Sequence, residues 1–192
     1  MKNKKISYET RFWAGFRAKN PFEAFDALFD FAHLDYYKQN LSQAVLYCNK
    51  GQVYKQEAPG NVFVFYTAIS SFLKVCYSVK GKGKKWKVNP SVRTETVFHL
   101  SSLTKEEYDN PFLALRNAFQ ERTLQEFEFF LYEIIELSLY PNNTDPGTDL
   151  ATPYIHLIKM LDAAQVLKER GIEKIKKREA EDAALDGTEA PG

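Results

Sequence analysis

The stretch NPFEAFDALFDFAHLDYYKQNLSQAV, residues 20–45, decides the fold because the chain repeats its pattern ninety positions later. Residues 110–135 read NPFLALRNAFQERTLQEFEFFLYEII, without a gap between the copies. The seven identical pairs are Asn20 and Asn110, Pro21 and Pro111, Phe22 and Phe112, Ala24 and Ala114, Phe29 and Phe119, Leu34 and Leu124, and Leu41 and Leu131. A repeat of this length predicts two pseudo-equivalent structural units.

Each copy has the pattern of a short helix, a bend and a longer helix. Asn20 can act as an N-cap, and Pro21 fits the first helical position, where an N–H would have no partner. Glu23 then places a carboxylate in the first turn. Apolar residues recur at helical spacing in both copies: Phe22, Phe25, Phe29 and Ala32, then Phe112, Leu115 and Phe119. The apolar spacing starts again in a new helical phase at Leu34 and Leu124, which predicts the longer second helix.

A polar loop with a Pro-Gly pair follows each copy and leads to an apolar segment. The first such segment, Val62 to Val79, is rich in β-branched and aromatic residues, yet its length favours a buried helix. We therefore expect an all-α helical bundle forming a single domain over 1–175. Unit one covers about 9–79, a connector 80–94, and unit two about 95–175. Trp86 and Val88 could form one arm of a short hairpin in the connector, and 176–192 is expected to be a charged, disordered tail.

The composition excludes several broad classes. Lys and Arg number 26 against 25 Asp and Glu, so the net charge of +1 creates no global field for nucleic acid or anionic lipid. Cys48 and Cys76 each end an apolar run, as small buried thiols do, which favours a reducing compartment. The N-terminus lacks the apolar stretch of a secretory signal, and the uncharged run 58–73 is shorter than a membrane span. We expect a soluble, cytoplasmic protein without membrane insertion.

A basic cluster lies between the two copies and gives the first functional hypothesis. No acidic residue occurs between Lys80 and Arg93. The cluster consists of Lys80, Lys82, Lys84, Lys85, Trp86 and Lys87. Lysines on a glycine-containing loop can follow a phosphate backbone, and an indole can stack on an unpaired base. The alternative interpretation is a solvated connector with its tryptophan packed into the core.

The segment RTETVFH places Arg93 and His99 at an Arg-x5-His spacing. This spacing resembles the Arg-x4-6-His signature of the HEPN ribonucleases, small all-helical proteins whose dimers bring two such motifs together to cut RNA. The resemblance covers seven residues. It implies that the imidazole would move protons while the guanidinium stabilises charge on the phosphodiester.

The remaining signals for metal binding or catalysis are structural in our interpretation. Asp30 and His33 have the spacing of a ferritin-like ligand pair, but Gln120 and Thr123 stand at the corresponding positions of the second copy. His156 lies in an apolar run and is expected in the core or at an interface. Because the sequence carries no nucleophile elbow, phosphate loop or Cys–His constellation, we predict no catalytic residue, metal or cofactor.

The aromatic content gives the leading hypothesis. The chain holds 15 Phe and 11 Tyr, and the segment 127–140 distributes aromatic residues over more than one face of its helix. These residues are Phe127, Phe129, Phe130, Tyr132 and Tyr140. A helix that is apolar on several sides is either central in its bundle or shared with another chain. We therefore predict a non-catalytic binding or accessory protein that acts through contacts with a protein partner or with a second copy.

Overall fold

The computed structural model describes residues 10–48, 52–55, 58–90, 100–140 and 149–175, with the side chain of Lys84 excepted. Within these residues the fold is almost entirely helical, which confirms the all-α prediction. The elements are α1 (Arg11–Ala14), α2 (Pro21–Phe31), α3 (Leu34–Cys48), α4 (Pro59–Val79), the 3-10 helix η1 (Lys82–Lys84), β1 (Trp86–Val88), α6 (Lys105–Asp109), α7 (Phe112–Glu121), α8 (Leu124–Leu139), α9 (Ala151–Arg170) and β2 (Ile172–Lys174).

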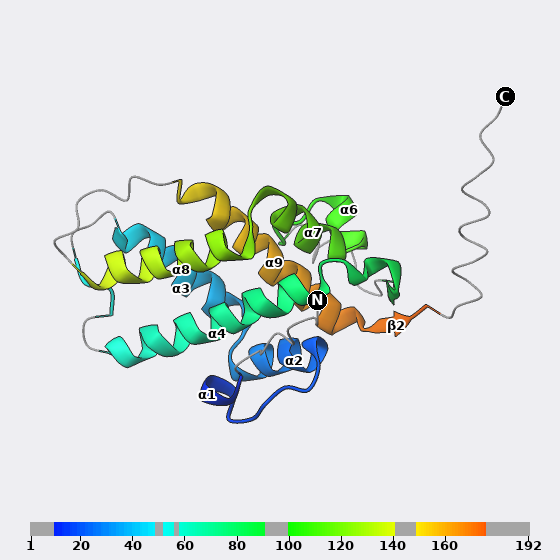
Figure 1. Cartoon of the computed structure of the whole chain (residues 1–192), viewed down its shortest axis with the longest axis horizontal. Coiled ribbons are helices and arrows are strands. Elements are labelled where there is room, and N and C mark those ends of the chain that lie inside the picture. The colour runs from blue at the N-terminus through cyan, green and yellow to red at the C-terminus, as the bar shows by residue number, and fades with distance from the viewer. Residues whose placement is uncertain (1–9, 49–51, 56–57, 91–99, 141–148, 176–192) are drawn as a thin grey trace, which may run out of the picture.

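Four long helices form the centre of the bundle (Figure 1). Helix α3 packs on α8 and α9, and α8 packs also on α4. The shorter helices cover the outside: α2 packs on α4 and α9, while α7 packs on α9 and α4. Helices α1 and α6 complete the two ends of this layer, α1 on α2 and α4, and α6 on α7 and α9.

Both copies of the repeated sequence contribute to one hydrophobic core. Phe25 and Tyr37 from the first copy and Phe127 from the second are almost completely buried. The segment Val62 to Val79 is helical, as predicted, and Phe65 and Phe72 of α4 join the same core. Tyr37 is accommodated there because its hydroxyl donates a 2.6 Å hydrogen bond to the carbonyl of Leu28.

Among the described helices, α4 alone has the length and apolar composition that could cross a membrane. In the bundle, 56% of its apolar window is buried against other parts of the protein. A buried core helix of a helical bundle can have the same length and apolar composition, so these two properties do not show that α4 crosses a membrane.

The helix starts differ between the two copies. Asn20 caps α2 as predicted, since its Oδ1 accepts hydrogen bonds of 3.0 Å from the amides of Phe22 and Glu23. Asn110 does not act in this way: α7 begins at Phe112 without a side-chain cap. The reason is α6, which ends immediately upstream and uses the Asn110 amide for a bond to the Glu106 carbonyl.

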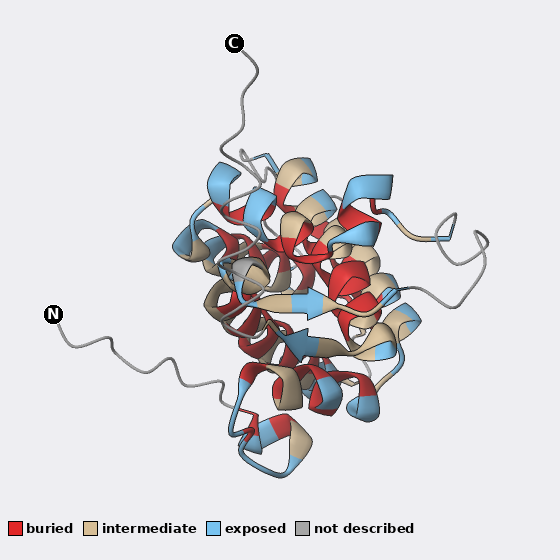
Figure 2. Cartoon of the chain, turned by 90° about the vertical axis from the view of Figure 1, so that its right-hand side faces the viewer, coloured by how far each residue is buried: buried red, intermediate tan, exposed pale blue. Residues whose placement is uncertain are grey.

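Two short strands close one end of the bundle, where Figure 2 looks directly onto them. Strand β1 forms at Trp86–Val88, but its partner is β2, which follows α9, rather than a second arm within the connector. The pairing is antiparallel, with Lys87 opposite Glu173. The hairpin prediction was therefore wrong about the partner, because strand pairing across the fold leaves no local signal in the sequence. The predicted tail, 176–192, lies outside the described residues.

Candidate interaction surface

The five aromatic residues predicted for an interface divide into two groups. Phe127 is 0% exposed and Phe130 3%, so both belong to the core and their assignment to an interface was wrong. Phe129 and Tyr132 lie on the outer side of α8 and Tyr140 follows its last residue; the three are 53–58% exposed. Helical periodicity explains the division within α8, because positions 129, 132 and 136 share one face of a helix whereas 127, 130, 131 and 134 share the opposite one.

Two further aromatic side chains that the sequence reasoning missed extend this surface. Phe12 of α1 is 60% exposed and Phe63 of α4 is 58% exposed. Their rings meet edge-on with centroids 5.6 Å apart. The signal for Phe63 becomes visible once α4 is accepted as a helix, since the buried positions 62, 65, 69, 72 and 76 leave 63 on the other side.

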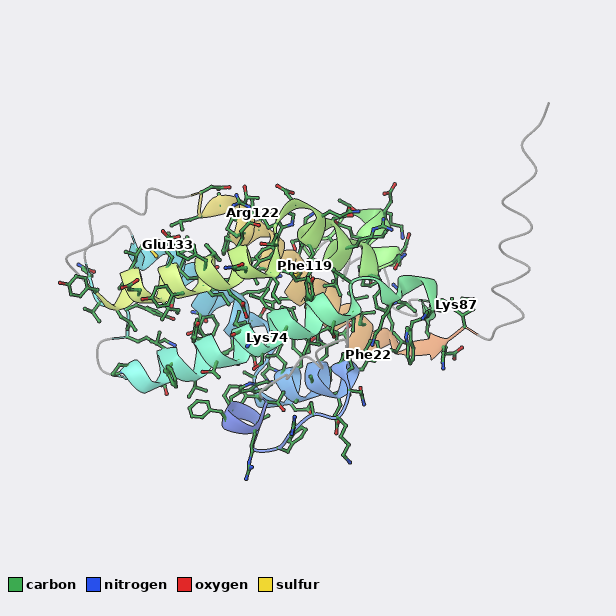
Figure 3. All side chains as sticks on the ribbon, viewed as in Figure 1. Phe22, Lys74, Lys87, Phe119, Arg122 and Glu133 are labelled. Carbon is green, nitrogen blue, oxygen red and sulfur yellow. The ribbon has the colours of Figure 1, made fainter. Side chains whose placement is uncertain are left out.

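Helix α4 lies between α1 and α8, and it runs antiparallel to α8 (Figure 1). Lys74, labelled in Figure 3, and Glu128 link the two helices, with Nζ and Oε1 3.8 Å apart. Further along, Tyr132 lies within electrostatic range of Tyr66. The pKa of Tyr132 is raised because the Glu136 carboxylate is close and accepts a hydrogen bond from the phenol. We call the surface formed by Phe12, Phe63, Tyr66, Phe129, Tyr132 and Tyr140 the aromatic face.

The surface shared by α3 and α9 has a different chemistry. Ser42 and Tyr154 are joined through their hydroxyls at 2.8 Å. Lys38 donates a 2.7 Å bond to the buried carboxylate of Asp162. Gln39 stands on α3 ninety positions before Phe129 and is exposed. Leu46 of α3 and Ile155 of α9 are also exposed, but neither is aromatic, so exposed rings like those on α4 and α8 are not required by the packing of the long helices.

A groove of about 350 Å³ borders the aromatic face at Phe129. Arg122, labelled in Figure 3, donates a 2.7 Å bond to Asp149 on its wall. The complete lining is Arg122, Gln125, Glu126, Phe129, Phe130, Glu133, Asp149 and Pro153. It joins three carboxylates, one guanidinium and an exposed ring, so any ligand contact here would combine apolar packing with attraction for a cationic group.

The backbone amides at the helix starts beside this groove already donate hydrogen bonds to side chains of the same chain. Thr123 and Glu126 form a reciprocal capping box on α8, and bonds from Thr123 lower the pKa of Glu126. Asp149 accepts 3.1 Å bonds from the amides of Ala151 and Thr152 at the start of α9, and its pKa is lowered by its bonds to Thr152. These amides are therefore not offered to an external anion.

The basic cluster is partly built into the fold. The Lys80 ammonium lies 3.8 Å from the centre of the Tyr77 ring and 5.2 Å from that of Phe119. Trp86 is half-buried, with its ring 5.2 Å from that of Phe22. Lys85 and Lys87 are exposed, and Lys87 projects at the strand end of the bundle (Figure 3). Lys82 is half-buried in η1.

The segment around the cluster is held against the bundle. Gly83 lies so close to α7 that an added Cβ would come 3.1 Å from the Cβ of Phe112. Glu173 stands opposite Lys87 in the strand register and reduces the positive charge there. The tryptophan packs on the core, as the alternative interpretation proposed, while Lys85 and Lys87 remain available at the surface.

The weaker candidates have structural partners. Asp30 pairs with Lys168 at 2.6 Å, and His33 is exposed at the bend after α2. His156 lies 2.8 Å from the carboxylate of Glu121 and edge-on to the Phe127 ring. Over the described part of the chain, no group of three or more His, Cys, Asp or Glu could hold a metal ion.

The two thiols are poor nucleophiles. Burial raises the pKa of Cys48 to about 11 and that of Cys76 well above its ordinary value. Arg93 and His99, on which the resemblance to the HEPN ribonucleases depends, lie outside the described residues.

No family model, curated protein or solved structure matches this chain. The chemistry of its own surface therefore carries the functional argument.

Proposed function

We propose that this chain is a non-catalytic interaction protein and that the aromatic face is its binding surface. The observation that carries the proposal is the exposure of Phe12, Phe63 and Phe129 on neighbouring helices of one side of the bundle. Five large rings on this side, Phe12, Phe63, Phe129, Tyr132 and Tyr140, are each 53–60% exposed. Together they leave roughly 500 Å² of aromatic residue surface in water, and the largest apolar patch on a monomer, commonly of about this size, is often functional.

The internal comparison with α3 and α9 supports this choice. We propose that the two halves of the chain are related by an approximate two-fold axis, with α2, α3 and α4 corresponding to α7, α8 and α9. In support, the contacts of α4 with α2 and α8 match those of α9 with α7 and α3. On such a scaffold, Gln39 and Ser42 are the counterparts of Phe129 and Tyr132. The aromatic residues then reflect a role of the second half rather than a requirement of the fold.

The proposal is tested by removing the aromatic face without touching the core. The variant combines Phe129→Gln and Tyr132→Ser, which give α8 the side chains that α3 has at positions 39 and 42, with Phe63→Ser on α4. The matched control, Leu46→Ser with Ile155→Ser, removes two exposed apolar residues from α3 and α9. Proteins retained by the wild type from a nuclease-treated lysate would be identified, purified and titrated against all three forms.

We expect the aromatic variant to lose at least tenfold in affinity for the purified partner, while the control binds like the wild type. Equal binding by both variants would reject the aromatic face as the site. Turnover of a nucleic acid, nucleotide or peptide that a point mutation abolishes would reject the non-catalytic role.

A second candidate function is binding of single-stranded nucleic acid by the basic cluster. It is favoured by an extra segment: six residues, 80–85, separate α4 from β1, whereas Gly171 alone separates α9 from β2. The added residues include Lys80, Lys82 and Lys85, so the charge lies in a part that the second half does not have. We expect Lys82→Ala, Lys85→Ala, Lys87→Ala to weaken salt-dependent binding of a fluorescent oligonucleotide. Unchanged affinity in that variant, or no measurable affinity in the wild type at low salt, would remove this candidate.

A further inference from the structure

We infer that the partner on the aromatic face is a second copy of this chain, related to the first by a two-fold axis that passes between the two copies of α4. This inference rests on the proposed function, because it uses the same surface. Self-association is supported by the distribution of charge on the two sides of α4, together with the uncharged surface of α4 between Phe63 and Lys74.

The two helices that flank α4 have opposite charges. Residues 10–19, which contain α1, carry Arg11, Arg17 and Lys19 and no acidic side chain. Helix α8 carries four glutamates and no basic side chain: Glu126, Glu128, Glu133 and Glu136. A surface with a basic edge, an apolar centre and an acidic edge is complementary to itself after a half-turn.

The centre of this surface can be approached closely by another helix. Between Phe63 and Lys74, the half-buried residues on the outer side of α4 are Tyr66, Thr67 and Ser70, none of which is charged. Two copies of α4 crossing at Thr67 and Ser70 would bring uncharged residues together, and Lys74, one turn further along, is paired with Glu128 of its own chain. The same half-turn places α1 of each copy over α8 of the other, so that Arg11 and Arg17 face the glutamates.

The available area fits a stable but modest dimer. Such interfaces bury about 800 Å² on each partner. The exposed rings supply roughly 500 Å² of this, and the polar edges on α1 and α8 complete it. Phe12, Phe63 and Phe129 would form the desolvated centre, and the charged residues would form the rim that sets the orientation.

Paired charge reversals test both the dimer and its orientation. One variant carries Arg11→Glu and Arg17→Glu, and the other Glu128→Lys and Glu136→Lys. Sedimentation equilibrium from about 1 to 200 μM would follow each chain alone and a mixture of the two. In the mixed dimer the acidic α1 of the first variant would face the basic α8 of the second, and the basic α1 of the second would face the acidic α8 of the first. Both contacts would again join opposite charges. The control Asp35→Lys with Glu169→Lys, on α3 and α9, changes the net charge as the glutamate variant does, but away from the aromatic face.

We expect the wild type to reach twice its monomer mass of 22.2 kDa at high concentration. Each reversed variant alone should dissociate at least about tenfold more readily, the mixture should recover association, and the control should match the wild type. Circular dichroism would confirm that each variant is folded, so that a loss of association reports on the surface.

The outcomes separate this inference from the proposed function. A wild type that stays at 22.2 kDa throughout, while the aromatic variant loses a different purified partner, overturns self-association and keeps the aromatic face as a binding surface. Dimers that both reversed variants form unchanged overturn the orientation through α4. Dimers that also survive the aromatic variant overturn the inference and the proposed surface together.

Discussion

The indole Nε1 of Trp13 donates a 3.1 Å hydrogen bond to the hydroxyl of Ser71, across 58 positions of the sequence. Both residues are buried, and Ser71 in turn donates a 2.9 Å bond to the carbonyl of Thr67, one turn earlier in α4. Since α1 is only a single turn long, this bond and the packing of the indole hold it on α4. The position of Phe12, and with it the basic edge of the aromatic face, depends on this contact.

Removing the acceptor should therefore destabilise the protein. We expect Ser71→Ala to lower the free energy of unfolding by about 1–3 kcal/mol, because the indole N–H then loses its partner inside the core. Trp13→Phe will cost more, since it also removes buried apolar volume. Urea denaturation followed by far-ultraviolet circular dichroism would measure both variants and the double variant. A double variant whose loss equals the sum of the single losses would show that the hydrogen bond contributes nothing.

Asp162 of α9 also joins distant parts of the chain through partly buried hydrogen bonds, to Lys38 of α3 and to Ser102. It is 3% exposed, pairs with Lys38, and its Oδ2 accepts bonds of 2.8 and 2.7 Å from the amide and hydroxyl of Ser102. We expect Asp162→Ala to cost about 2–4 kcal/mol, because it leaves an ammonium and two donors without their acceptor. Asp109→Ala, which removes an exposed i,i+4 pair with Lys105, is the control and should change stability by less than about 0.5 kcal/mol. Similar losses in the two variants, measured by urea denaturation, would contradict this account.

Helix starts show how far the repeated sequence predicts the structure. The Asn-Pro-Phe signal gave the correct start for α2, where Asn20 is the cap. It missed the start of α7, because α6 occupies the residues before Asn110 and the asparagine becomes the end of that helix. A local motif specifies a capping geometry only where the preceding chain is free to adopt it.

This difference predicts unequal effects of the same substitution. Asn20→Ala should cost about 1 kcal/mol, since it removes the acceptor for two amides of the first turn of α2. Asn110→Ala should cost much less, because its side chain caps no helix. Thermal and urea denaturation of the two variants would compare them directly. Equal losses would show that the Asn110 side chain stabilises the α6–α7 corner in another way.

Periodicity predicted the helices but not all of their buried faces. The length of the segment ending at Val79 correctly indicated a helix, since a strand of that length is uncommon. The aromatic residues of α8 occupy more than one face, and only the packing shows that Phe127 and Phe130 face the core while Phe129 and Tyr132 face outward. The pairing of β1 with β2 could not be predicted, as the two strands are more than eighty residues apart and only the packing of α4 and α9 brings them together.

The division of α8 into a core side and a surface side predicts contrasting effects on stability. Phe127→Ala should lower the free energy of unfolding by about 3–5 kcal/mol, because it opens a cavity where the ring packs edge-on against Phe119. Phe129→Ala should change it by no more than about 0.5 kcal/mol in the monomer. Measured at low protein concentration to avoid association, a large loss for Phe129→Ala would place that ring in the core and remove it from the aromatic face.

Stability at acid pH should depend on Glu107, which closes the capping box of α6. Burial alone would raise its pKa, but bonds from the Thr104 amide at 3.0 Å and the Lys159 ammonium at 2.9 Å outweigh it, so the pKa falls below its ordinary value of 4.5. A carboxyl whose pKa is lower in the folded than in the unfolded state stabilises the protein above the unfolded value, and this contribution is lost as the pH falls through the folded value. Glu107→Gln should therefore be less stable than the wild type at pH 7, and the gap should narrow as the pH drops below about 4.5. Urea denaturation of both proteins between pH 7 and pH 3 measures the gap directly, and a gap that stays constant over that range would show that the Glu107 carboxylate makes no net contribution.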